Sequence, residues 1–207
     1  DFSIMNSNNK AQELRDKYNW NDKKVFAYFG AHGVANDLMQ VIEVANKMKD
    51  NKRIYFVLIG DGMQKKMLQD KVKEYNLENL QFIDSVSKNE VVDYINAVDI
   101  CMAILKKTDT FKTVYPNKVF DYMSCKKPVL VTIDGITRKL VEESKCGLYS
   151  EPENLEQFEQ SIYQYTKMSK DELEELGNSG FEFVKENFDR EKLAERYIEV
   201  IKEVVND

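Results

Sequence analysis

The stretch YPNKVFDYM at residues 115–123, followed by KPVL at residues 127–130, predicts a short helix that leads into a buried strand. Pro116 suits the first turn of that helix, because the N–H that proline lacks has no partner there. Lys118 and Asp121 are three residues apart and share one face of the helix. A lysine at a helix start is suited to bind a diphosphate, and a carboxylate one turn later can accept hydrogen bonds from a ribose. The structural alternative is a solvated salt bridge between the two side chains.

Apolar strand patterns alternate with helical patterns on both sides of this stretch. Buried strands are predicted at residues 25–30, 54–60, 80–83, 100–105, 129–133 and 147–149. Strands that alternate with helices predict a parallel sheet covered on both faces. We therefore expect an α/β fold, a doubly wound Rossmann-like parallel sheet of about six strands with a helical C-terminal tail. Ligands of such sheets lie beyond the carboxyl ends of the strands.

Two serines mark predicted helix starts. Ser87 with Glu90 and Ser169 with Glu172 have the spacing of a capping box. Residues 1–22 are polar and rich in asparagine, so we interpret them as a linker or arm. Residues 23–207 then form a single domain, which is long enough to bury a core of its own.

Composition excludes several classes of protein. The chain has 207 residues and a net charge of −6, so a basic nucleic-acid interface is not expected. It has no apolar run of the roughly 18–20 residues that span a membrane. Cys101, Cys125 and Cys146 are odd in number and widely spaced, which argues against a metal site or a disulfide and favours a reducing cytoplasm. The chain starts at Asp1 with neither a start methionine nor a signal peptide, so we expect a fragment of a longer protein.

The loop after the first predicted strand contains two glycines and the only histidine. Gly30 and Gly33 can bring the backbone close to a phosphate, and a tight turn between strand and helix is the alternative. The third glycine of the dinucleotide motif is missing, so a dinucleotide cofactor is disfavoured. Alone, His32 cannot make a metal site or a catalytic triad, but it could donate a hydrogen bond to a phosphate or a sugar hydroxyl.

Five short motifs occur in a characteristic order. These are G-x-x-G, V-L-I-G-D-G, F-I-D, V-D-I and P-N-K-V-F-D-Y-M-x-x-x-K-P-V-L. From about residue 22 to the end, the chain resembles the C-terminal, donor-binding domain of family-4 glycosyltransferases with the GT-B fold, of the bacterial capsule and lipopolysaccharide type. The resemblance implies a retaining, metal-independent hexosyltransferase that needs no cofactor. Such an enzyme transfers a sugar from a nucleotide sugar, usually a UDP-sugar, to an acceptor glycan or lipid-linked sugar.

The resemblance also implies roles for residues of this chain. Asp121 corresponds to the family's second motif acid, which binds the ribose hydroxyls, and Lys118 would contact the diphosphate. Gly30 and Gly33 would surround the phosphates, and the loop around Asp84 and Ser85 would border the base. The expected substrate-binding set is Gly30, His32, Gly33, Asp84, Ser85, Asn117, Lys118, Asp121 and Gly135. Catalytic residues are expected mostly in an N-terminal domain that this chain lacks, with His32 as the one candidate here.

The chain also departs from the family pattern. Thr113 stands eight residues before Asp121, where the family has its first paired glutamate. Ala31 and Asn36 lie where an arginine and a lysine often follow the first strand. We therefore expect Lys118 to be the main phosphate cation, and this fragment to bind nucleotide weakly and transfer nothing. The acceptor, and any peripheral contact with the inner face of a membrane, would belong to the missing domain of a cytoplasmic enzyme.

Two other functions stay open at this stage. One is a GT-B nucleotide-sugar epimerase-like enzyme, which would need further carboxylates and histidines in its cleft; the single histidine argues against it. The other is a non-catalytic Rossmann-like nucleotide-binding module. A phospho-acceptor module would need clustered acids at the strand ends, and the sequence shows none there.

Overall fold

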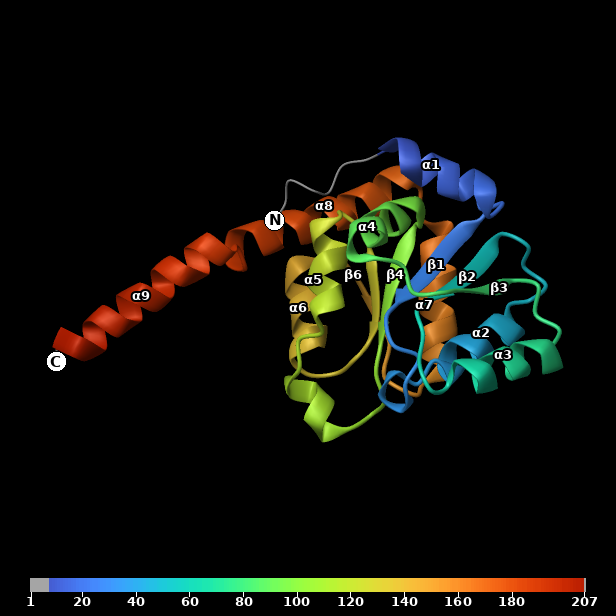
Figure 1. Cartoon of the computed structure of the whole chain (residues 1–207), viewed down its shortest axis with the longest axis horizontal. Helices are drawn as coiled ribbons and strands as arrows, with labels where there is room; N and C mark the ends of the chain where they lie inside the picture. The colour runs from blue at the N-terminus through green and yellow to red at the C-terminus, as the bar shows by residue number, and fades with distance from the viewer. Residues whose placement is uncertain (1–7, 207) are drawn as a thin grey trace.

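A computed structural model describes residues 8–206 of the protein (Figure 1). The strands are β1 (Lys24–Phe29), β2 (Ile54–Ile59), β3 (Leu80–Ile83), β4 (Ile100–Ile104), β5 (Val129–Thr132) and β6 (Gly147–Tyr149). The helices are α1 (Asn8–Lys17), α2 (Met39–Lys47), α3 (Lys65–Glu74), α4 (Lys88–Ala97), α5 (Asn117–Ser124), α6 (Ile136–Ser144), α7 (Leu155–Lys167), α8 (Lys170–Asn187) and α9 (Arg190–Asn206). All six predicted strands are confirmed to within one residue of their predicted ends.

The strands form one parallel sheet in the order β3-β2-β1-β4-β5-β6. This is the doubly wound order, in which the direction of winding reverses between β1 and β4. Phe29 pairs with Ile59, and Ile59 pairs with Ile83, so β1, β2 and β3 end at the same level. The loops that follow these three strands therefore leave the sheet side by side. The predicted fold class is confirmed.

Alternate residues of β1 face two separate cores, because successive side chains of a strand point to opposite faces. Val25 and Ala27 face the core that α1, α4, α5 and α6 cover, while Phe26 and Tyr28 face the core under α2, α3 and α7. All four side chains are fully buried. The apolar runs of the strands thus follow from a sheet that is covered on both faces.

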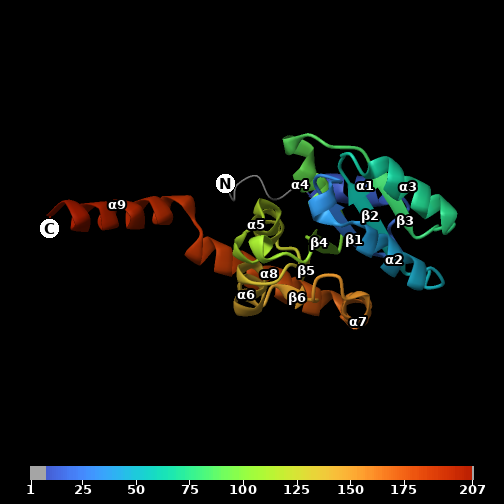
Figure 2. The same ribbon diagram turned by 90° about the horizontal axis from the view of Figure 1, so that it is seen from below.

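Both predicted capping boxes are confirmed, at Ser87 with Glu90 and at Ser169 with Glu172. Asp189 Oδ1 accepts a hydrogen bond from the Lys192 N–H at the start of α9. Figures 1 and 2 show α9 extending away from the body of the domain, which agrees with the predicted helical tail.

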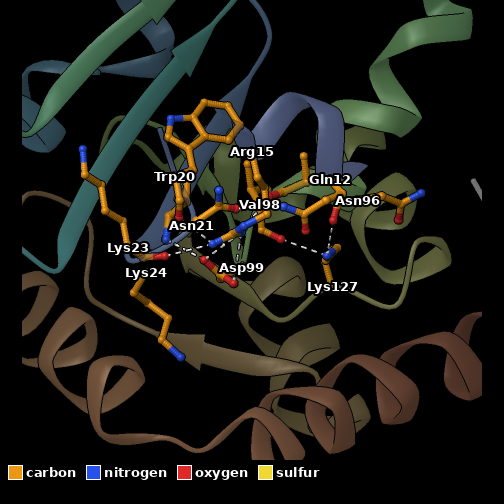
Figure 3. A network of polar contacts seen from close by, with 12 residues as sticks. Gln12, Arg15, Trp20, Asn21, Lys23, Lys24, Asn96, Val98, Asp99 and Lys127 are labelled. Atoms are coloured by element: carbon orange, nitrogen blue, oxygen red, sulfur yellow. Dashed lines mark hydrogen bonds and ion pairs between the residues drawn. The ribbon is translucent and has the colours of Figure 1, made fainter. Parts of the chain in front are cut away.

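Arg15 fastens α1 to the amino edge of the sheet (Figure 3). Its guanidinium donates hydrogen bonds to the Ala97 carbonyl at 2.8 Å and the Trp20 carbonyl at 2.7 Å, and it pairs with Asp99 at 3.4 Å. Trp20 is fully buried. The described part of the predicted arm, residues 8–22, therefore packs on the domain. Residues 1–7 lie outside the described residues, and the predicted domain boundary at residue 22 stays a prediction.

Candidate functional site

A cavity of about 510 Å³ opens beyond the carboxyl ends of β1, β2 and β3, between helices α4 and α5. The three loops contribute Gly30, Gly60 and Ser85 to its wall. Helix α5 contributes Lys118 and Asp121, and α4 contributes Val91 and Ile95. The cavity lies where a doubly wound sheet binds its ligands, beside the point at which the strand order reverses.

Tyr122 sets the position of α5 at this point. The paired register of β1 and β4 ends at Tyr28 and Met102. Just beyond it, the Tyr122 hydroxyl accepts a hydrogen bond from the Phe29 N–H and donates one to the Met102 carbonyl, both at 3.3 Å. The hydroxyl thus satisfies backbone groups of two diverging strands. Since Tyr122 follows Asp121 directly, the same contact holds Asp121 at the cavity. Pro116 caps α5 and the helix begins one residue later, so the prediction that it lies in the first turn is wrong by one residue.

Close packing of backbones shapes the loops that line the cavity. Gly30 has φ +136° and Gly60 has φ +144°, a region that glycine alone adopts readily. A Cβ on Gly60 would lie 1.9 Å from the Gly30 carbonyl oxygen, and one on Gly30 would lie 2.8 Å from Lys118 Nζ. The first two loops therefore touch through backbone, and Lys118 reaches over them.

We expect Gly60→Ala to lower the free energy of unfolding by about 2 kcal/mol, because the new methyl group meets backbone and φ is unfavourable. The matched control is Gly33→Ala. Gly33 has φ −107°, and a Cβ there would meet nothing closer than Asn36 Oδ1 at 3.6 Å, so its stability should change by less than about 0.5 kcal/mol. Urea denaturation measures both. Equal losses in the two variants would contradict this account of the loops.

Within the described part of the chain, Lys118 is a cation without a carboxylate partner. Its Nζ lies 3.9 Å from the centre of the Tyr28 ring and beside Gly30. Burial lowers the pKa of the Lys118 ammonium to about 7, because protein atoms replace the water around it. The ion pairs of the described residues do not include one between Lys118 and Asp121, so the salt-bridge alternative is not realised. A half-buried ammonium that faces an open cavity is suited to bind an anion.

Asp121 is exposed on the same wall. Partial desolvation raises the pKa of its carboxyl group, and the Lys88 charge opposes that rise. Its side chain accepts no hydrogen bond from the described residues, so both oxygens are available to a ligand. Thr113, the residue in the place of the family's first motif acid, is also exposed and donates its hydroxyl to the Thr110 carbonyl at 3.1 Å.

The other end of the cavity is apolar. Val86, Val91 and Ile95 line it together with Ser85, and the planar face of a base suits such a surface. The neighbouring Asp84 carboxylate is 95% exposed and pairs with Lys65 at 2.6 Å, so it lies at the rim and not in the wall. The predicted loop is therefore at the cavity, with Ser85 as the residue that reaches it.

His32 lies beneath the cavity and not in its wall. The ring is fully buried, close to the rings of Tyr28 and Phe82. Neither ring nitrogen has a hydrogen-bond partner among the described residues. Burial and the nearby charge of Lys65 lower the pKa of His32 to about 4, so the ring is neutral at pH 7. Its predicted hydrogen bond to a phosphate or sugar stays a prediction.

Three further predicted residues lie away from the cavity wall, namely Gly33, Asn117 and Gly135. Gly135 precedes α6 with φ +81°, and a Cβ there would lie 2.1 Å from the Lys112 carbonyl oxygen, which explains the glycine by packing. Ligand contacts of these three residues stay predictions. Sequence reasoning missed the wall formed by Val91 and Ile95, for which the helical spacing of apolar residues in α4 was the available signal.

A larger cavity, of about 680 Å³, lies at the opposite edge of the sheet around Arg15, Lys24 and Asp99. That edge carries the amino ends of the strands, where parallel sheets do not bind their ligands. The described part of the chain has no cluster of His, Cys, Asp or Glu side chains arranged to hold a metal ion. Among residues 8–206, no helix combines the length and the apolar character that crossing a membrane requires.

The fold and the cavity together define a Rossmann-like α/β domain with a candidate ligand cavity beside the point where the strand order reverses. The chain belongs to the family described as "Glycosyl transferases group 1", whose model matches residues 10–183. The resemblance seen in the motifs is therefore confirmed.

Curated relatives are also glycosyltransferases by name. The chain is 24% identical over 184 residues to the putative colanic acid biosynthesis glycosyl transferase WcaI of Escherichia coli K12, covering 87% of this chain and 44% of WcaI. It is 25% identical over 134 residues to the probable glycosyltransferase WbjE of Pseudomonas aeruginosa, covering 62% of this chain and 32% of WbjE. The chain thus spans less than half the length of these relatives.

Solved structures share the fold. Anabaena Alr3699/HepE, crystallised in complex with UDP, matches 98% of this chain and 55% of its own with a TM-score of 0.85 and 15% identity. The C-terminal domain of the glycosyl transferase group 1 protein LpcC of Francisella tularensis matches 92% of this chain and 98% of its own, with a TM-score of 0.74 and 21% identity.

Proposed function

We propose that this chain is the donor-binding domain of a retaining glycosyltransferase that takes its sugar from a nucleotide sugar, with UDP as the favoured nucleotide. The observation that carries the proposal is the cavity at the strand ends. Its wall holds Lys118, a half-buried cation with no carboxylate partner among residues 8–206, and an available carboxylate, Asp121, one turn apart on α5. Relatives that bind UDP with the same fold support this choice of nucleotide, since HepE is described in complexes with UDP and with UDP-glucose.

The residues suggest how the donor is held. The Asp121 carboxylate accepts hydrogen bonds from the ribose hydroxyls, and the base lies against Val86, Val91 and Ile95. The diphosphate then lies beside Gly30, within reach of the Lys118 ammonium. When the bond between the sugar and the diphosphate breaks, negative charge grows on the departing oxygen. The Lys118 charge stabilises that oxygen without a metal ion.

The acceptor belongs to the part of the enzyme beyond this chain. We propose an acceptor glycan or lipid-linked sugar in bacterial surface-polysaccharide synthesis, on the support of the name of WcaI, a putative colanic acid biosynthesis glycosyl transferase. The whole enzyme would work in the cytoplasm and touch a membrane only through its other domain. The epimerase alternative is disfavoured, because Asp61 and Asp121 are the carboxylates of the described cavity wall and no histidine lies in it.

A thermal-shift experiment tests the nucleotide class by comparing the unfolding midpoint of the chain with UDP, GDP, ADP and NAD, each at about 5 mM. We expect UDP to raise the unfolding midpoint most and NAD least, because a ligand stabilises only the state that binds it. Isothermal titration calorimetry then measures the dissociation constant of UDP. Stabilisation by NAD above UDP, or by no nucleotide at all, would contradict the proposed function.

A further inference from the structure

Lys65 joins two loops of the proposed donor site although it does not line the cavity. It is the first residue of α3, and its side chain is 11% exposed. The ammonium donates to the Gly60 carbonyl at 2.9 Å and to Asp84 Oδ1 at 2.6 Å. Gly60 directly follows β2 and Asp84 directly follows β3, so one buried side chain links the segments that follow two neighbouring strands.

The backbone of the loop that Lys65 reaches has few hydrogen bonds of its own. Residues 84–87 have no regular structure, and the N–H groups of Asp84, Ser85 and Val86 make no backbone hydrogen bond within the described chain. Val86 packs against the core that α4 and α5 cover, and the capping box at Ser87 follows it. Asp84 is 95% exposed, and the Lys65 hydrogen bond and charge lower the pKa of its carboxyl group, so the carboxylate stays ionised and bonded.

That loop forms the wall against which the base is proposed to lie. Ser85 and Val86 line the cavity directly after Asp84, and Gly60 lines it from the loop after β2. Both walls are thus bonded to the same ammonium, beyond the point where the Gly60 N–H donates to the Ile83 carbonyl at 3.0 Å. A free loop would have to be ordered by each ligand that binds, and that ordering costs binding free energy.

We propose that Lys65, acting through Asp84, is a positioning residue for the nucleoside half of the donor site. It holds the loop of residues 84–86 in the conformation that receives the base. This inference rests on the proposed function. It predicts that loss of Lys65 weakens the binding of uridine and of UDP by the same factor, about three- to thirtyfold, because both ligands use the same wall and the phosphates do not.

The test compares three variants of the full chain by calorimetry with uridine and with UDP. Lys65→Met removes the charge at similar length. Asp84→Ala removes the carboxylate partner of Lys65 at an exposed position, where the substitution does not endanger folding. The matched control is Lys66→Met, since Lys66 is the next residue of α3 and pairs with Asp70 at 2.7 Å in the solvent. A variant that is less stable but still folded, with the loop in its native conformation, would keep the wild-type affinity for uridine.

Equal losses for uridine and UDP in Lys65→Met and Asp84→Ala, with Lys66→Met unchanged, are the expected result. Unchanged uridine affinity in Asp84→Ala would overturn the inference about Lys65. If the wild type still bound UDP in that case, the proposed function would stand. A loss for UDP that exceeds the loss for uridine would also overturn it, because Lys65 would then act on the phosphates. Absence of UDP binding in the wild type would overturn the proposed function and this inference together.

Discussion

Lys118→Ala is expected to weaken the binding of UDP by about 2–4 kcal/mol, a factor of roughly thirty to several hundred, and to leave uridine binding nearly unchanged. The reason is that Lys118 is a half-buried ammonium that no described residue pairs with ionically, placed beside Gly30 at the proposed phosphate position. Ala31 and Asn36 supply no second positive charge on that loop. Loss of the amine therefore removes the main counter-charge of the diphosphate but no contact of the nucleoside.

Calorimetric titration with UDP and with uridine separates the two contributions. Lys139→Ala is the matched control, because Lys139 is an exposed lysine of α6 outside the cavity wall. Lys118→Met adds a check on folding. Burial of the amine lowers its pKa, so the charged form destabilises the folded state and the methionine variant should be at least as stable as the wild type. Equal losses of UDP and uridine affinity in Lys118→Ala would show that Lys118 does not act on the phosphates.

The same lysine predicts a pH dependence. With a pKa of about 7, the protonated share of Lys118 falls from about one half at pH 7 to about one tenth at pH 8. The phosphates of UDP are already ionised in this range, since their last pKa is near 6. UDP affinity should therefore fall about fivefold from pH 7 to pH 8, and the dependence should vanish in Lys118→Ala. A wild-type affinity that stays constant over this range would contradict the assignment.

Asp121→Ala is expected to weaken UDP and uridine alike, by about 1.5–3 kcal/mol, the scale of a hydrogen bond to a charged group. Asp121 lies on the cavity wall with both carboxylate oxygens available, and Tyr122 holds the backbone beside it in place. Both ligands carry the ribose hydroxyls that this carboxylate is proposed to accept. The loss should therefore not depend on the phosphates, in contrast to the loss in Lys118→Ala.

A ligand without the hydroxyls tests that contact directly. Wild type should bind UDP more tightly than the 2′,3′-dideoxy nucleotide, and Asp121→Ala should bind the two equally. Stability is no obstacle, because desolvation raises the pKa of the Asp121 carboxyl group and its charge at pH 7 does not favour folding. If the variant kept the wild-type affinity for UDP, the ribose role of Asp121 would be wrong.

The secondary structure was largely predictable from local sequence. The strands at residues 54–60 and 129–133 are continuous apolar runs, and Ser87 and Ser169 start helices by bonding to a residue three positions later. Such signals depend on residues within one turn or one strand, so they can be recognised in the sequence before the fold is known. The parallel sheet and its ligand edge then followed from the alternation of strands and helices.

The site was predictable in part. Gly30, Ser85, Lys118 and Asp121 were predicted and do line one cavity. His32 illustrates the limit, because a glycine-rich loop at the ligand edge suggested an accessible side chain and the structure buries it completely. Burial depends on which residues of other elements pack against a side chain, and here the rings of Tyr28 in β1 and Phe82 in β3 lie close to the His32 ring.

By itself, the sequence determined the order and kind of the elements, the helix starts and the presence of a lysine and a carboxylate one turn apart. Only the tertiary structure decided that Lys118 turns to the Tyr28 ring and not to Asp121, and that Lys65 links Gly60 to Asp84. The physical reason is the distance along the chain over which each kind of interaction acts. Propensity, periodicity and capping arise between residues a few positions apart, whereas these contacts join side chains from separate strands and helices, and their geometry exists only once the sheet has aligned the strand ends.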